Sequence, residues 1–287
     1  MSETDRDDVT GVDTTGHEWD GIKELNNPLP RWWLWTLYLT ILWGIGYTIA
    51  YPAWPMISGA TGGLLGYSTR AAVAQEITAH EARNAGLVTE LLDTDMAQLP
   101  LNSDLNRYAV ARGGAVFRAQ CSQCHGQGAA GAKGYPNLLD DDWLWGGDMD
   151  NIVTSIRHGI RNETDLEARY SEMPAFKDIL SHDEIMQVVE FVTSLSKPGF
   201  DAALATPGAQ VFADNCASCH GEGAQGDTDL GAPDLTDAIW LFGGSRDDLT
   251  ETVEQARYGV MPAWGQRLSE EDVRAVAAYV HALGGGE

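Results

Sequence analysis

The chain has 287 residues, of which 44% are hydrophobic, and this length is enough for about two globular domains with accessory segments. It carries 42 acidic and 18 basic side chains, which gives a net charge of −24. Such a charge excludes nucleic-acid binding and disfavours a polyanionic substrate, whereas it suits a basic partner protein. Solubility alone, for example in a salty habitat, would also explain an acidic surface, so composition leaves both roles open.

Residues 1–31 form an acidic tail, and an uncharged apolar stretch follows at 32–49, with apolar character continuing to Ile57. About twenty such residues cross a bilayer as a helix, and aromatic side chains at both ends match the two headgroup belts. A cleaved signal peptide is the alternative, but the preceding segment is long and acidic, and no small-residue cleavage site follows. We therefore expect a retained transmembrane anchor at 32–57.

Residues 58–107 are expected to form a helical spacer or docking segment. Within them, 68–96 is rich in alanine and has larger apolar residues at helical spacing. No alternating pattern of a β-strand is apparent anywhere in the chain.

All four cysteines lie in two copies of Cys-x-x-Cys-His, at 121–125 and 216–220. This pattern is the attachment signature of c-type haem, in which two thiols bind the haem and the adjacent histidine binds its iron. A zinc knuckle would need further cysteines or histidines, and a redox pair would not need the histidine. The sequence therefore predicts two covalently bound haem c groups, held by Cys121, Cys124, His125, Cys216, Cys219 and His220.

The segments around the two motifs repeat one another. Residues 136–138 and 143–147 match 233–235 and 240–244, and each copy continues with Met-Pro-Ala and an aromatic residue. The first copy has an extra loop at 161–172. The repeat predicts two haem domains, at 108–197 and 198–287.

Each repeat is expected to begin and end with a helix. Residues 181–184 form a capping box before an amphipathic stretch, and 269–272 repeat this cap in weaker form. Thr206 and Pro207 resemble an N-cap followed by a proline at the first helical position, which predicts the start of the second domain's first helix.

The repeated Met-Pro-Ala segments supply candidates for the second iron ligand of each haem, Met173 and Met261. Core packing is the ordinary role of a methionine, but the repetition favours ligation. His158 is the alternative in the first domain; its counterpart is Tyr258, so we expect it to line the pocket. Arg157 and Arg257 occupy matched positions and either pair with haem propionates or are solvated.

The order anchor, domain, domain, together with the text of residues 118–126, 135–138, 142–147 and 173–176, resembles the dihaem subunit III of cbb3-type cytochrome c oxidase. The resemblance covers nearly the whole chain after the acidic tail. It implies an all-α fold, with one N-terminal transmembrane helix followed by two tandem class I cytochrome c domains.

By this resemblance, the chain accepts electrons from a soluble periplasmic cytochrome c. It passes them to the monohaem cytochrome c subunit and on to the catalytic haem–copper subunit, where oxygen is reduced. The family is found in the bacterial inner membrane, which together with periplasmic haem domains implies a cytoplasmic N-terminus. The alternative is a membrane-tethered dihaem carrier that serves another respiratory or photosynthetic complex.

Overall fold

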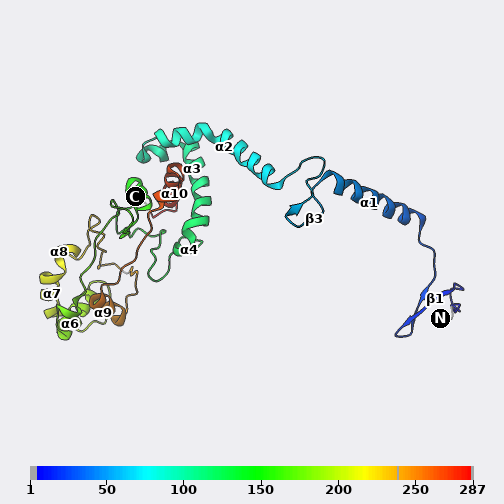
Figure 1. The fold of residues 1–287 in the computed structure, drawn as a ribbon. Coiled ribbons are helices and arrows are strands. Elements are labelled where there is room, and N and C mark those ends of the chain that lie inside the picture. The colour runs from blue at the N-terminus through cyan, green and yellow to red at the C-terminus, as the bar shows by residue number, and fades with distance from the viewer. Residues whose placement is uncertain (1–4, 238, 286–287) are drawn as a thin grey trace. The chain divides into compact units, whose positions relative to one another are not determined.

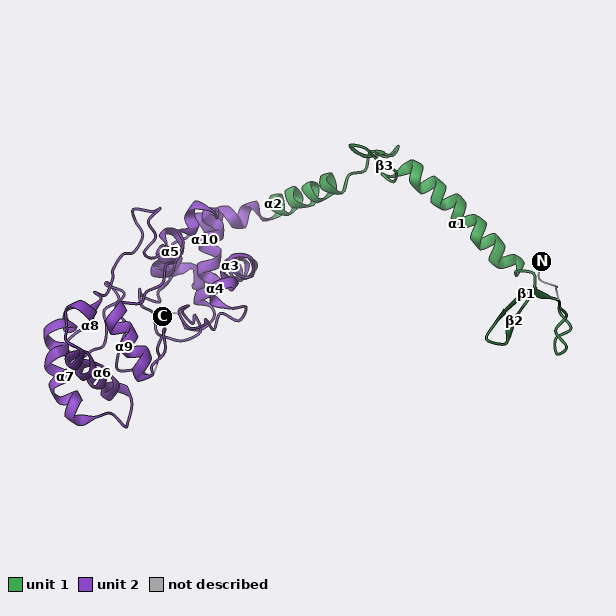
Figure 2. Cartoon of the chain, turned by 60° about the horizontal axis from the view of Figure 1, so that its bottom comes forward, with its two compact units in different colours: residues 1–83 green, residues 84–287 purple. Residues whose placement is uncertain are grey.

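The computed structural model describes residues 5–237 and 239–285 (Figure 1). The chain divides into two compact units, residues 1–83 and 84–287 (Figure 2). Each unit is described by itself.

The first unit begins with a β-hairpin of strands β1 (Thr14–Trp19) and β2 (Ile22–Leu25), which pair antiparallel. Asp20 and Gly21 join the strands with positive φ angles of 50° and 84°, the conformation of a tight hairpin turn. No strand was expected from the sequence, and this was wrong here. An Asp-Gly pair is typical of a two-residue hairpin turn. The flanking strands, however, are too polar to show the alternation of apolar and polar residues that marks a strand.

Helix α1 (Arg31–Ala50) covers most of the anchor expected at 32–57 but ends before its last seven residues. None of its residues is buried, and it is the one helix of the described chain long and apolar enough to cross a membrane. Its length of 20 residues matches a bilayer core. A short hairpin of β3 (Pro55–Met56) and β4 (Gly59–Ala60) follows, paired antiparallel.

Helix α2 (Thr69–Asp93) continues from the first unit into the second. The second unit is otherwise built of short helices, apart from isolated bridges among its described residues. In chain order they are η1 (Met96–Leu101), α3 (Ser103–Val116), the π-turn η2 (Phe117–Cys121), α4 (Ser122–His125), α5 (Met149–His158), η3 (Phe176–Asp178), α6 (His182–Ser196), α7 (Ala202–Asn215), α8 (Ala217–His220), α9 (Arg246–Gln255), η4 (Trp264–Gln266) and α10 (Glu270–His281).

The capping box of α6 is confirmed: the Ser181 hydroxyl accepts the Glu184 N–H, and the Glu184 carboxylate accepts the Ser181 N–H. Helix α7, however, begins at Ala202, where the Asp201 side chain caps the N-terminus. The expected start at Thr206 was therefore wrong, and Pro207 lies inside the helix. Pro207 is the sixth residue of α7 and lies beyond the first four, whose N–H groups have no intrahelical partners, so the helix gives up one backbone hydrogen bond there.

The second unit contains two hydrophobic cores, and neither core is made of one repeat. The first gathers α3, α5 and the end of α2 with α10, the last helix of the second repeat. The second gathers α7, α8 and α9 with α6, the last helix of the first repeat. We call these groups lobe 1 and lobe 2. Both figures show α3 beside α10, and α6 beside α7.

Matched glycines allow the two exchanged helix pairs to approach closely. A Cβ atom at Gly113 of α3 would lie 1.9 Å from the carbonyl oxygen of Ala275 in α10. At the equivalent Gly208 of α7, a Cβ would lie 2.0 Å from the carbonyl oxygen of Gln187 in α6. Both distances are far below van der Waals contact, so each crossing requires glycine. The terminal helices have therefore changed places between the repeats.

Ion pairs hold the exchanged helix α10 in lobe 1. The Arg112 guanidinium donates to Asp272 at 2.7 Å and to Glu271 at 3.5 Å. Arg274 of α10 donates at 2.7 Å to the carbonyl oxygens of Leu91, in the last turn of α2, and of Thr94, directly after that helix. The C-terminal part of α2 is thus a structural element of lobe 1.

Candidate functional site

The two Cys-x-x-Cys-His motifs adopt the same local structure in both lobes. Each forms the short helix α4 or α8 and ends at a glycine with positive φ, Gly126 at 79° and Gly221 at 77°. The chain then turns back, and the N–H of Gly131 or Gly226 donates to the histidine carbonyl at 2.9 Å. These turns place the two thiols and the imidazole of each motif on one helical turn, as covalent haem attachment requires.

The orientation of each histidine ring is set by a backbone carbonyl. His125 Nδ1 lies 3.0 Å from the carbonyl oxygen of Pro136, and His220 Nδ1 lies 3.1 Å from that of Pro233. A carbonyl only accepts, so Nδ1 carries the hydrogen and Nε2 keeps a free lone pair. Burial lowers the pKa of both imidazoles below the usual range, which the carbonyl bonds oppose. Both rings therefore present a neutral Nε2, the form that binds a metal.

In lobe 2 the motif opens on a cavity of about 600 Å³. Cys216, Cys219 and His220 line it together with Met173, which belongs to the first repeat. The remaining lining is mainly apolar and includes the buried side chains Val188, Val189, Phe212 and Leu249. Two thiols, a free imidazole nitrogen, a thioether and apolar walls fit a covalently attached haem c.

In lobe 1 the corresponding methionine comes from the second repeat. Met261 packs against the core that includes Cys121 and the buried Ile156. Its backbone forms an antiparallel bridge with Ile160, with hydrogen bonds of 3.0 and 2.9 Å. Met261 thus packs against the same core as Cys121 of the first motif, and Met173 lines the cavity of the second.

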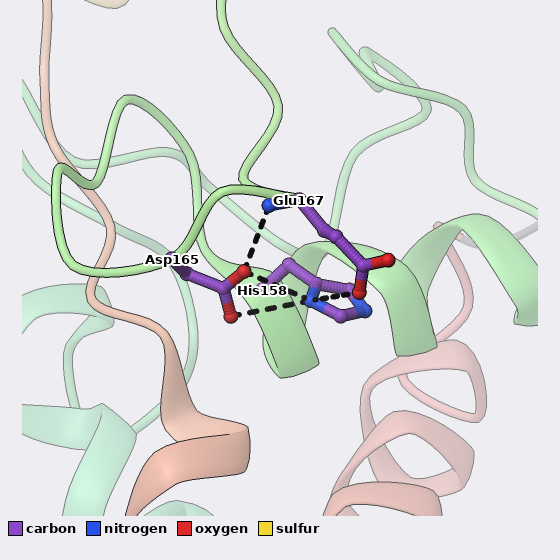
Figure 3. A group of neighbouring side chains, drawn as sticks. All are labelled: His158, Asp165 and Glu167. Atoms are coloured by element: carbon purple, nitrogen blue, oxygen red, sulfur yellow. Dashed lines mark hydrogen bonds and ion pairs between the residues drawn. The ribbon is translucent and has the colours of Figure 1, made fainter.

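His158 does not join Met173 in the haem cavity. Its Nδ1 lies 3.2 Å from the Asp165 carboxylate and 3.4 Å from that of Glu167, both in the extra loop of the first repeat (Figure 3). These two carboxylates hold its ring, and the expectation that His158 lines the pocket of the first haem stays a prediction. Tyr258, at the matched position, does line the cavity of lobe 2.

The matched arginines Arg157 and Arg257 both have protein partners. Arg157 forms an ion pair with Glu270 of α10 in lobe 1. Arg257 pairs with Glu251 at 2.6 Å and donates to the carbonyl oxygen of Asp248 at 2.7 Å. Their guanidinium groups thus hold helix termini, and only Arg257 lines the cavity.

Acidic side chains of both repeats gather beside the cavity of lobe 2. Asp140, Asp142 and Asp234 line it, with Asp141 and Asp237 close by. Burial, reinforced by these neighbouring carboxylates, raises the pKa of Asp142 to about 6. The run at 140–142 is visible in the sequence, but its approach to Asp234 and Asp237 of the second repeat is not.

The cysteines, histidines and methionines of both candidate sites were named from the sequence, but the exchange between the repeats was not expected. Arg161, which lines the cavity and contacts both methionine segments, was also missed. A signal existed only for the loop that Arg161 begins, since this loop interrupts the alignment of the repeats.

Comparison with known proteins finds two matching families along the chain. Residues 11–58 match the family described as the N-terminal domain of cytochrome oxidase-cbb3, FixP. Residues 109–192 and 203–280 each match the family described as cytochrome c oxidase, cbb3-type, subunit III.

Individual relatives match over almost their full length. The chain is 60% identical to the cbb3-type cytochrome c oxidase subunit CcoP of Cereibacter sphaeroides over 276 residues, covering 96% of this chain and 95% of that protein. It is 50% identical to the subunit FixP of Sinorhizobium medicae, covering 98% and 97%. It is also 50% identical to the subunit CcoP of Rhodobacter capsulatus, covering 96% and 97%.

Proposed function

The chain belongs to the subunit III family of cbb3-type cytochrome c oxidase, and from this membership we propose that it takes electrons from a soluble periplasmic cytochrome c and delivers them to the monohaem cytochrome c subunit. The chain is a membrane-anchored haem c subunit of an oxidoreductase complex. The catalytic haem–copper subunit then receives the electrons and reduces oxygen.

We propose two haem c groups, one in each lobe, with ligands that cross between the repeats. Cys121, Cys124 and His125 would hold the first, together with Met261. Cys216, Cys219 and His220 would hold the second, together with Met173. The observation that carries this proposal is the cavity of lobe 2, where Met173 lies with the second motif.

Each side chain has a separate task in this proposal. The thiols attach the group covalently, and the carbonyl of Pro136 or Pro233 orients the imidazole so that Nε2 is the donor atom. A thioether ligand raises the reduction potential relative to a second histidine, and the apolar walls keep water away from the site. Bound haem supplies reversible one-electron exchange at its iron.

The proposed location is the bacterial inner membrane, with residues 1–31 in the cytoplasm, the anchor at 32–57 and the spacer at 58–107. Cytochrome c domains at 108–197 and 198–287 lie in the periplasm. Two arguments support this topology: α1 precedes both motifs, and haem c is attached outside the bacterial cytoplasm. The two domain ranges describe the sequence repeats, whereas the lobes exchange their terminal helices.

The test is to tag the C-terminus, solubilise the membranes in mild detergent and record what copurifies. We expect b-type haem together with c-type haem, two haems c per copy of this chain, and a copper-dependent oxygen consumption. A protein that purifies alone with only c-type haem would contradict the oxidase assignment and indicate a tethered carrier.

A further inference from the structure

We propose that Arg161 is a positioning residue that ties together the two chain segments carrying Met173 and Met261. The proposal rests on the axial ligands proposed above and explains what holds the two crossing segments in place.

The side chain of Arg161 reaches both segments at equivalent points. Its Nε donates to the carbonyl oxygen of Ser171 at 2.6 Å, and its Nη1 donates to that of Gly259 at 3.2 Å. Ser171 stands two residues before Met173, and Gly259 stands two residues before Met261. One planar guanidinium thus binds the backbone two residues before each methionine.

The backbone at Arg161 is also hydrogen-bonded where these two segments meet. Its N–H donates to the carbonyl oxygen of Arg169 at 2.7 Å, and the preceding Ile160 exchanges two hydrogen bonds with Met261. Arg161 also has a φ of 52°, a left-handed conformation that is uncommon for residues other than glycine. Such a conformation persists only where the surrounding contacts enforce it.

The charge of Arg161 is used for this bridge and not for an ion pair. Among the residues that the structure describes, no carboxylate oxygen lies within 4.0 Å of its guanidinium. It is partly buried and lies 5.6 Å from the ring centre of Tyr258. Hydrogen bonds from a charged donor are stronger than neutral ones, and the fork geometry of arginine lets one side chain serve two acceptors.

The experiment compares the haem-loaded full-length chain with its Arg161→Gln and Arg161→Lys variants. Arg169→Gln is the matched control, because Arg169 lies in the same loop and loses the same charge, but its guanidinium binds Trp145 and Asn151. One readout is the weak absorbance band of each iron–sulfur bond, assigned by its loss in Met173→His and Met261→His. The other is hydrogen–deuterium exchange of the backbone at 159–161 and 259–261, with haem content per chain measured alongside.

For Arg161→Gln we expect weakening of both bands, with haem content retained, and backbone exchange at least about tenfold faster, since two charge-assisted hydrogen bonds are lost. In Arg161→Lys we expect both bands to stay weak, because one ammonium cannot span the two carbonyls in the same way. Arg169→Gln should leave bands and exchange unchanged.

Several results would overturn the bridge. These are intact bands with unchanged exchange in Arg161→Gln, the loss of only one band, full rescue by lysine, or equal losses in Arg169→Gln. If the wild-type chain has neither band, the ligand proposal fails instead, and the exchange measurement still decides whether Arg161 ties the segments.

Discussion

At the residue scale, the crossing of Met173 and Met261 makes a prediction that separates this fold from two independent cytochromes. In a chain that keeps only the first haem, through Cys216→Ala and Cys219→Ala, Met261→His should lower the remaining reduction potential. The shift should be on the order of hundreds of millivolts, because a nitrogen ligand replaces the thioether. Redox titration of the detergent-solubilised protein measures it.

Met173→His in that same single-haem chain is the matched control and should leave the potential nearly unchanged. The reciprocal chain, with Cys121 and Cys124 replaced by alanine, should show the reverse dependence. A first haem that responds to Met173 and not to Met261 would mean that each repeat supplies its own ligand.

The Asp142 carboxyl gives a pH-dependent prediction. Its pKa in the folded chain is about 6, above the ordinary value of 3.8, because burial and like charges disfavour ionisation. Below pH 4 both folded and unfolded chains hold the proton, so Asp142→Asn should not change the free energy of unfolding. Between pH 4 and 6 only the unfolded chain releases it, and the wild type loses stability as the pH rises.

Above pH 6 the advantage of Asp142→Asn should be constant, on the order of 1 kcal/mol once solvent screening is allowed for. Thermal unfolding at pH 4 and at pH 7 measures this difference. Asp214→Asn, at an exposed position of α7, is the control and should be neutral at both pH values. An equal effect of Asp142→Asn at pH 4 would show that a cause other than ionisation is at work.

At the element scale, sequence patterns predicted those features that depend on neighbours in the chain. The anchor, the capping box at Ser181 and the structure of both haem motifs each arise within a few turns of one segment, and all were predicted. The start of α7 was misplaced because the Thr206–Pro207 pair is typical of a helix start, whereas here Asp201 caps the helix five residues earlier and the proline lies in the second turn despite its missing N–H.

The exchange of α6 and α10 could not be predicted, because the two helices carry equivalent apolar faces. Each would satisfy either core by hydrophobic pattern alone, so the partner is decided by the connections between repeats and by contacts such as Arg112 with Asp272. The contacts of Asp142 with Asp234 and Asp237, and that of Arg161 with Gly259, were likewise hidden, since they join segments distant in the chain.

Gly113 provides the prediction for these helix pairs. Gly113→Ala places a methyl group 1.9 Å from the carbonyl oxygen of Ala275, which forces α3 and α10 apart. We expect a loss of about 3 kcal/mol or more in the free energy of unfolding, the upper range for overpacking, because the opposing atom is backbone and cannot rotate away. Denaturant unfolding of the haem-loaded protein measures it.

Gly208→Ala should produce a similar loss through α6 and α7, where the methyl group would lie 2.0 Å from the Gln187 carbonyl oxygen. Gly86→Ala in α2 is the control, because a Cβ there meets no atom within 4 Å. That substitution should be neutral or stabilise the chain by up to about 1 kcal/mol through helix propensity. Normal stability of Gly113→Ala would contradict the pairing of α3 with α10.

At the scale of the whole molecule, the exchange makes each lobe dependent on both repeats. Lobe 1 needs Met261 and α10 from the second repeat, and lobe 2 needs Met173 and α6 from the first. The two proposed haem sites therefore belong to one folding unit, although their sequences read as tandem domains. The shared helices and methionine segments connect the two sites within one fold, which suits the transfer of electrons from one to the other.

The net charge of −24 makes the last prediction, because it bears on how a donor reaches the molecule. If the acidic surface attracts a basic donor, the rate at which reduced donor is oxidised should fall as salt is added. Exposed charges are largely screened beyond about 10 Å at 0.1 M ionic strength, so attraction over longer distances is lost there. With a small basic cytochrome c as the probe, we expect a decrease of about tenfold or more from low to high salt.

Oxidation of a small uncharged reductant by the same preparation is the control, and its rate should be independent of salt. A decrease with both reductants would locate the salt effect in a later electron-transfer step, after donor binding. A rate with the basic cytochrome that stays constant would mean that the negative charge serves solubility rather than attraction, since steered association always weakens as ionic strength rises. Stopped-flow measurement of the bimolecular rate constant separates these cases, because steering acts on that constant and leaves the electron transfer within the complex unchanged.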